Sequence, residues 1–198
     1  MADVVRLDPN AYRRTPWKNG GGVTVDIAAA YRPGATPGSW SGMLWRFGRT
    51  EIVAPGPFSD LSGYDRILTV IDGRGLMLDI EGDKDRTTSL DVREPYRPVR
   101  FRGEDRIVSR LEAGPVAVLN LIADREHEID VAMVSGTDAR ALSGPIDIVY
   151  ALADSTVAVG EETFLLAGDE ALRLDGAGML ALRAGRVALA TISSRSAP

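Results

Sequence analysis

Short apolar runs, broken at nearly regular intervals by glycine and proline, constrain this sequence more than any other feature. The chain has 21 glycines and 11 prolines among its 198 residues, above the roughly 12% that the two usually contribute together. Within the runs, apolar and polar side chains alternate, as in residues 23–27. Alternation with a period of two places the apolar side chains on one face of a strand. Many short strands separated by turn residues predict an all-β sandwich or barrel with little helix.

Helical periodicity is weak along the chain, and only residues 137–142 are expected to form a short helical turn. The strand pattern stops at the charged segment 124–128 and resumes after it. At 198 residues the chain is long enough to bury a core in one domain or in two small ones. We therefore expect two parts, an N-terminal one of residues 1–127 and a smaller C-terminal one of residues 128–198.

Charge and apolar content exclude several classes of partner. The formal net charge is −5, so the chain has no basic field for nucleic acid or for an anionic membrane. No apolar run approaches the roughly 20 residues that a membrane-spanning helix needs. The first residues include an acid and lack the apolar core of a signal peptide, so a cytoplasmic protein is expected.

The sequence offers few ligands for a metal. It contains no cysteine, which excludes disulfides, thiolate chemistry and cysteine-ligated metals. His127 is the only histidine, whereas cupin-type and facial-triad metal sites need at least two imidazoles. Its neighbours in residues 124–128 are all charged, which indicates a solvated turn. We therefore expect neither a metal nor another cofactor.

Residues 16–24 read PWKNGGGVT and are the segment best suited to a binding loop. Three consecutive glycines cost backbone entropy and add no packing, so an ordinary connector rarely needs them. They let the backbone approach a ligand or a neighbouring strand closely, with its N–H groups and the Lys18 and Asn19 side chains turned toward it. Lys18 is one of only two lysines among 23 basic residues, and its compact ammonium suits a carboxylate. The alternative is a flexible turn beside which Lys18 is merely exposed.

Four further residues combine a polar group with an apolar setting. Arg46 follows Trp45 on an expected strand, so it points either to solvent or into the mouth of a barrel. Asp65 and Arg66 precede an apolar strand, and such a pair contributes little energy unless the rim of the barrel is also the pocket. Asn120 shares a strand face with apolar residues, as either a satisfied core group or a pocket wall.

Five short motifs together resemble the HutD/Ves family. They are residues 16–24, Trp45-Arg46, Gly-Pro-Phe-Ser at 56–59, Gly-Tyr-Asp-Arg at 63–66 and Asp-Gly-x-Gly at 72–75. The Trp-Lys-Asn-Gly-Gly-Gly block is the most specific of them, and the resemblance extends from about residue 12 to residue 122. It implies a cupin-like fold of two small β-barrels in one chain, a bicupin, without the metal-binding histidines of typical cupins.

The same resemblance implies a link to histidine utilisation in bacteria. Family members are thought to restrain or tune the pathway by binding an intermediate such as urocanate or formylglutamate, and no settled catalytic activity comes with the family. This chain departs from the family pattern near the expected pocket. Gly48 replaces a serine, residues 118–120 read VLN in place of Asp-Phe-Asn, and residues 25–27 read VDI in place of Arg-Glu-Ile. The ligand can therefore differ from that of the better-known members.

We accordingly predict a metal-free, cupin-like protein that binds a small carboxylate metabolite and regulates histidine utilisation, with urocanate and formylglutamate as candidate ligands. Lys18 and Asn19, with either Arg46 or Arg66, would hold the carboxylate at the open end of the first barrel. Charge-assisted hydrogen bonds of this kind suit a small anion. The predicted ligand-binding residues, in which Trp45 and Phe58 form the walls, are Trp17, Lys18, Asn19, Gly20, Gly21, Thr24, Trp45, Arg46, Phe58, Asp65, Arg66 and Asn120.

Two other functions stay open. A metal-free isomerase or lyase would need a titratable base, and Asp26 and Asp65 are the acids placed to serve as one. An interaction module would use open strand edges to assemble, for instance as a homodimer. Because the sequence shows no acid–base pair, a binding protein is favoured over an enzyme.

Overall fold

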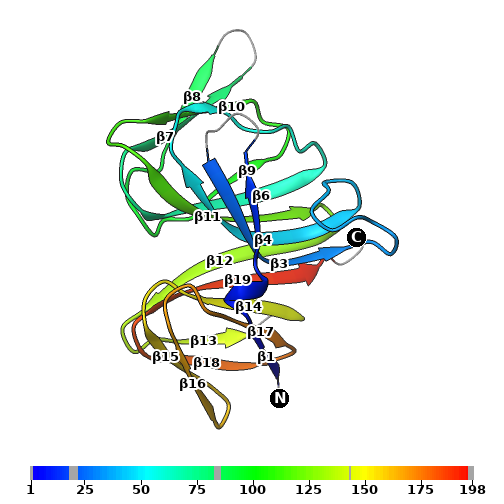
Figure 1. The fold of residues 1–198 in the computed structure, drawn as a ribbon, viewed down its shortest axis with the longest axis vertical. Coiled ribbons are helices and arrows are strands. Elements are labelled where there is room, and N and C mark those ends of the chain that lie inside the picture. The colour runs from blue at the N-terminus through cyan, green and yellow to red at the C-terminus, as the bar shows by residue number, and fades with distance from the viewer. Residues whose placement is uncertain (1, 18–21, 83–85, 143, 196–198) are drawn as a thin grey trace. The chain divides into compact units, whose positions relative to one another are not determined.

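The computed structural model of the chain describes residues 2–17, 22–82, 86–142 and 144–195 (Figure 1). The regular structure in these ranges is antiparallel β-strand, apart from one 3-10 turn, Pro9–Ala11, so the all-β prediction is confirmed. The chain divides into two compact units. Arg13–Glu126 forms the central unit, and Met1–Tyr12 together with His127–Pro198 forms the terminal unit.

The central unit contains two antiparallel sheets that share one core. Apolar side chains from both sheets meet there, among them Leu68 and Val118 of the larger sheet and Leu76 and Leu78 of the smaller. The larger sheet has the order β2 (Arg13–Pro16), β3 (Gly22–Tyr31), β4 (Met43–Ile52), β11 (Val116–Asp124), β6 (Tyr64–Asp72) and β9 (Val99–Arg102). The smaller has the order β5 (Gly56–Pro57), β10 (Ile107–Leu111), β7 (Leu76–Glu81) and β8 (Thr87–Asp91).

The terminal unit repeats the plan of two sheets around a core. Leu172 and Leu189 of its larger sheet pack in the same cluster as Val157 and Leu182 of its smaller one. The larger sheet has the order β1 (Asp3–Leu7), β17 (Ala171–Asp175), β14 (Ile146–Ala151), β19 (Arg186–Ser194) and β12 (His127–Ser135). The smaller has the order β13 (Ala139–Leu142), β18 (Gly178–Ala184), β15 (Ser155–Val159) and β16 (Glu162–Leu166).

The end of the glycine-rich segment 16–24 belongs to a strand. Gly22 begins β3 and lies against β4, and its carbonyl accepts a hydrogen bond from the Trp17 backbone N–H. A methyl group at Gly22 would lie 2.1 Å from the carbonyl oxygen of Glu51 on β4. Glycine is therefore required here by the close approach of two backbones, one of the two uses that the sequence predicted.

Two expectations about architecture are corrected. In the part of the chain that the structure describes, no ladder joins the two sheets of a unit, so neither unit is a closed barrel. Residues 137–142 do not form a helical turn, because Ala139–Leu142 is β13 and pairs with β18. Among the described residues, the short helical turn lies instead at Pro9–Ala11, where the Asp8 carboxylate accepts a hydrogen bond from the Asn10 backbone N–H at 2.9 Å.

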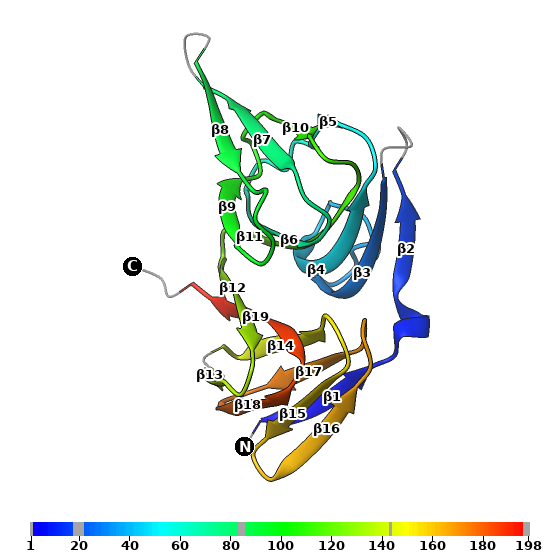
Figure 2. The same cartoon turned by 90° about the vertical axis from the view of Figure 1, so that its left-hand side faces the viewer.

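The first residues lie with the second half of the chain. β1 pairs with β17 over Asp3–Leu7, and Figure 2 shows it among the strands of the terminal unit. The expected N-terminal part, residues 1–127, thus differs from the central unit by the segment Met1–Tyr12 and by His127. No local sequence signal identifies the partner of a single short strand, since pairing depends on which distant edge is free. No helix within the described ranges is long and apolar enough to cross a membrane.

Asp147 is a buried acid in the terminal unit. It lies on β14 between Leu174 of β17 and Thr191 of β19, and its exposed fraction is 0%. One carboxylate oxygen accepts a hydrogen bond from the Thr191 hydroxyl, and the other has no partner among the described residues. Burial raises the pKa of Asp147 above its ordinary value, although hydrogen bonds from Thr191 and the Gly144 backbone oppose this.

We predict that Asp147→Asn removes a pH dependence of stability. A raised pKa means that the folded state binds more protons than the unfolded state from about pH 4 upward, so the wild-type free energy of unfolding falls as the pH rises through this window. The stability difference between variant and wild type should grow by about 1.4 kcal/mol for each unit of raised pKa. Urea unfolding at several pH values between 4 and 8 measures it. The exposed Asp3→Asn is the control, and parallel curves for Asp147→Asn and wild type would contradict the prediction.

Candidate functional site

The central unit contains a cavity of about 510 Å³, within the usual range of roughly 300–1,000 Å³ for small-molecule sites. Most of its floor comes from one face of the larger sheet, and the remaining walls come from residues before β3, between β3 and β4, and around β5. Its lining consists of Thr15, Pro16, Trp17, Thr24, Trp40, Arg46, Thr50, Ile52, Pro57, Phe58, Ser59, Leu61, Arg66, Asn120 and Ile122.

Strand register arranges the floor in rows that run across the sheet. Residues directly opposite each other on antiparallel strands point to the same face. Arg46 on β4 is opposite Ile122 on β11, which is opposite Arg66 on β6. The first row thus places an apolar side chain between two arginines. Because neighbouring strands are about 4.8 Å apart, the two arginine backbones are separated by about 10 Å.

The next two rows carry oxygen-bearing side chains. Asp26 on β3 is opposite Gly48 on β4, which is opposite Asn120 on β11. One step further along the strands, Thr24 is opposite Thr50. Successive rows on one face are two residues apart, or about 7 Å. The floor therefore changes from cationic, through amide and carboxylate, to hydroxyl along the strand direction.

Arg66 is a buried cation without a counter-ion. Its exposed fraction is 8%, no carboxylate of the described residues lies within ion-pair distance, and its Nε has no hydrogen-bond partner. The guanidinium carbon lies 5.0 Å from the centre of the Phe58 ring and 4.9 Å from that of Phe101. Burial and the nearby charge of Arg46 lower the pKa of Arg66 to about 10. An uncompensated buried charge is destabilising, so this environment favours an incoming anion.

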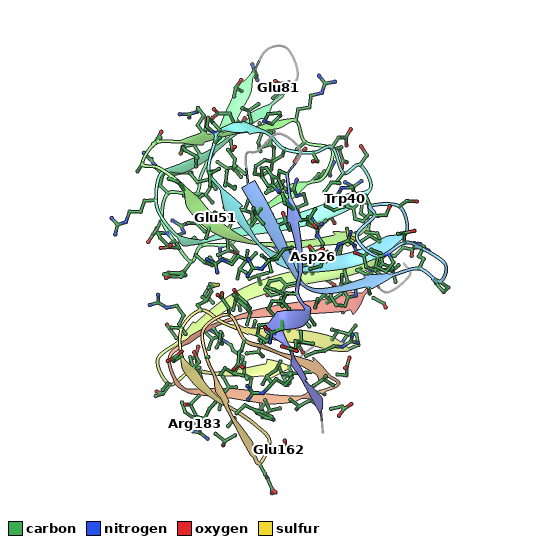
Figure 3. All side chains as sticks on the ribbon, viewed as in Figure 1. Asp26, Trp40, Glu51, Glu81, Glu162 and Arg183 are labelled. Carbon is green, nitrogen blue, oxygen red and sulfur yellow. The ribbon has the colours of Figure 1, made fainter. Side chains whose placement is uncertain are left out.

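Arg46 is ion-paired with Asp26 and stacks on an aromatic ring. Its Nε lies 3.5 Å from the Asp26 Oδ1, which accepts no hydrogen bond from the described residues, and its guanidinium lies 4.0 Å above the Trp40 ring. Figure 3 labels Asp26 and Trp40 in the central unit. Burial lowers the pKa of Arg46, an effect that Asp26 opposes. Burial raises the pKa of Asp26 in turn, against the attraction of Arg46 and Arg13.

A chain of hydrogen bonds crosses the floor from the aromatic wall to the amide. The Trp17 indole N–H donates to the Thr24 hydroxyl at 2.9 Å, and the Thr24 and Thr50 hydroxyls lie 3.2 Å apart. The Asn120 amide N–H₂ donates to the Thr50 hydroxyl at 3.5 Å. This leaves the Asn120 amide oxygen without a partner among the described residues. The chain fixes the Trp17 ring and aligns the amide.

Six of the predicted site residues line this one cavity, and their role in binding stays a prediction. They are Trp17, Thr24, Arg46, Phe58, Arg66 and Asn120. Lys18, Asn19, Gly20 and Gly21 lie outside the described residues.

Two predicted site residues do not line the cavity. Trp45 alternates with Arg46 on β4, so it points to the opposite face, where it is 1% exposed and serves the core. Asp65 alternates with Arg66 in the same way, and its carboxylate accepts from the Arg125 guanidinium at 3.2 Å. Trp45 as a wall and Asp65 as a ligand contact are therefore corrected.

Sequence reasoning missed several lining residues, of which Trp40 and Thr50 are the most important. Trp40 lies in the proline- and glycine-rich connection between β3 and β4, which carries no strand periodicity. Thr50 lies four residues after Arg46 on the same strand, so the alternation that separated Arg46 from Trp45 also places Thr50 on the floor. The signal for Thr50 was thus available, whereas the signal for Trp40 was not.

The described residues contain no group of three or more His, Cys, Asp or Glu side chains placed to hold a metal ion. The cavity lining itself contains two arginines, an amide and hydroxyls. Guanidinium groups bind carboxylates through charge-assisted hydrogen bonds. The chemistry of the cavity is therefore that of an anion site with aromatic walls.

Comparison with known proteins agrees with the sequence motifs. The model of the HutD family matches residues 9–190. The chain belongs to the HutD family. This family is associated with histidine utilisation genes, and a relative from Pseudomonas putida, described as an uncharacterized 21.2 kDa protein in the hutC 3′ region, is 32% identical over 180 residues, which is 89% of each chain.

Solved structures with a similar fold match nearly the whole chain. HutD from Pseudomonas fluorescens SBW25, in a formate condition, has a TM-score of 0.79 at 30% identity and covers 98% of this chain and 100% of its own. A conserved protein of unknown function from Pseudomonas aeruginosa PAO1 has a TM-score of 0.81 at 25% identity, covering 97% and 100%. A cupin 2 conserved barrel domain protein from Leptotrichia buccalis, at 7% identity and a TM-score of 0.52, shares the fold alone over 88% of this chain and 89% of its own. The HutD fold of this chain is therefore cupin-like.

We predict that Arg66→Met raises the stability of the ligand-free protein. An apolar side chain of similar length removes the buried charge and still packs against Phe58 and Phe101, so the free energy of unfolding should rise by about 1–3 kcal/mol. Urea unfolding in a buffer without carboxylates measures this effect. Arg106→Met, which alters an exposed arginine of the same unit, is the matched control. Destabilisation by Arg66→Met would show that the guanidinium stabilises the ligand-free fold.

Proposed function

We propose that the central unit of this HutD-family protein binds a small carboxylate metabolite in the cavity between Arg46 and Arg66. The observation that carries the proposal is the buried, unpaired guanidinium of Arg66. A carboxylate above Ile122 would accept hydrogen bonds from both arginines and neutralise the uncompensated charge. Each such charge-assisted hydrogen bond contributes about 1.5–3 kcal/mol.

The aromatic walls define the rest of the ligand. Trp17, Trp40 and Phe58 line the same cavity, and flat apolar surfaces of this kind suit a planar or short aliphatic body.

The family context supports a role in histidine utilisation. The Pseudomonas putida relative is described by its position in the hutC 3′ region. Urocanate and formylglutamate are carboxylate intermediates of histidine breakdown, and both are small enough for a cavity of about 510 Å³. The protein would act in the cytoplasm as a binding protein that senses one of these metabolites and tunes the pathway.

A second candidate function, a metal-free isomerase or lyase, is favoured by one observation. Asp26 is a carboxylate beside the cavity whose pKa is raised by burial and whose Oδ1 accepts no hydrogen bond from the described residues. A group of this kind can accept and hold a proton. Turnover of urocanate in the presence of a chelator, abolished by Asp26→Asn, would support an enzyme. Asp65 has no such setting, because it is paired with Arg125.

Calorimetry with urocanate and formylglutamate tests the binding function. Wild-type protein should bind at least one of the two, and Arg66→Met should weaken that binding by at least tenfold, or about 1.4 kcal/mol. Arg106→Met should bind as the wild type does, because this arginine is exposed and lies outside the cavity lining. If folded wild-type protein gives no heat with either ligand, the proposal is wrong.

A further inference from the structure

We propose that the cavity selects, among small carboxylates, those that also carry an N–H donor, which Asn120 and Asp26 receive. The inference rests on the proposed function, because it concerns the second end of a ligand whose carboxylate meets Arg46 and Arg66. It rests on oxygen acceptors that the protein leaves unused one row away from the arginines.

Asn120 supplies the first unused acceptor. The residue is 9% exposed, and on its face of β11 the neighbours Val118 and Ile122 are apolar. Its N–H₂ group donates to the Thr50 hydroxyl, which orients the amide. Its Oδ1 has no partner among the described residues. A buried acceptor left unpaired costs about 1–3 kcal/mol, and a donor on the ligand would recover that cost.

Asp26 supplies the second acceptor in the same row; it does not line the cavity itself but is ion-paired with the lining residue Arg46. Its side chain is 10% exposed, and its Oδ1 lies 3.5 Å from the Arg46 Nε and accepts no hydrogen bond from the described residues. Gly48 lies between Asp26 and Asn120 in this row. A methyl group there would lie 2.7 Å from the Val25 carbonyl oxygen and 3.5 Å from the Asp26 Cα, so the β3 backbone packs directly against Gly48. No other side chain therefore stands between Asp26 and Asn120 in the row.

The rows set the spacing of the ligand's two ends. The arginine row and the acceptor row are two residues apart on the same face, or about 7 Å. A ring or amide N–H joined to a carboxylate by two or three atoms lies about 4–5 Å from it, and the hydrogen bonds at the two ends cover the remaining distance. Hydroxyls of Thr24 and Thr50 lie in the row beyond and are already hydrogen-bonded to each other, to Trp17 and to Asn120. The free acceptors thus lie in the middle row.

A pair of matched ligands tests the inference. Urocanate carries an imidazole N–H, and 3-(2-furyl)acrylate has the same carboxylate and a ring of the same size without that donor. At pH 8, calorimetry with the wild-type protein should give urocanate an affinity at least tenfold higher. Asn120→Leu, which removes the acceptor and keeps the volume, should reduce this preference to within threefold.

Controls separate the inference from the proposed function. Thr69→Val removes a buried, unpaired hydroxyl on the other face of β6 and should leave the preference unchanged. If circular dichroism shows that Asn120→Leu does not fold, urocanate methylated on nitrogen replaces it, and wild-type protein should bind this ligand no better than furylacrylate. Equal wild-type affinities for urocanate and furylacrylate would overturn donor selection and leave carboxylate binding intact. Binding of neither ligand would overturn both.

Discussion

A guanidinium that is buried without a counter-ion determines the chemistry of the cavity in the central unit. Proteins usually neutralise such a charge with a carboxylate. Arg66 instead lies over the adjacent rings of Phe58 and Phe101, and aromatic faces attract a cation without cancelling its charge. The second arginine of the row, Arg46, adds repulsion that lowers the pKa of Arg66 further. The ligand-free cavity is thus held in a state of higher free energy that an anion would relieve.

The hydrogen-bond chain from Trp17 to Asn120 complements this electrostatic arrangement. It runs through two threonine hydroxyls on adjacent strands, so an aromatic wall and a buried amide are positioned by the same sheet that carries the arginines. Groups fixed on strands lose little conformational entropy when a ligand arrives. The floor is therefore preorganised, whereas the aromatic walls Trp17, Trp40 and Phe58 lie outside the strands.

The sequence predicted the strands and the sheet face to which individual side chains point, because the alternation of side chains along a strand is a local property. It therefore separated Arg46 from Trp45 correctly, yet it still assigned Trp45 to the cavity by its aromatic character. It expected Arg46, Arg66 and Asn120 to meet on the strength of family resemblance alone. Their convergence depends on the strand order β4-β11-β6, which is not the order of the sequence. Trp40 was missed because it lies in a connection without strand periodicity. The partner of β1 was missed because the pairing of distant strands leaves no local sequence pattern.

The pairing of β1 with β17 makes the central unit an insertion within the terminal one. During synthesis on the ribosome, the whole of Arg13–Glu126 emerges before β17 has been translated. The central unit can therefore assemble co-translationally, while β1 has no partner strand until β17 has been translated. Because the central unit is inserted in the terminal unit, the pocket can fold early, and the pairing of β1 with β17 completes the terminal unit in a separate, later step.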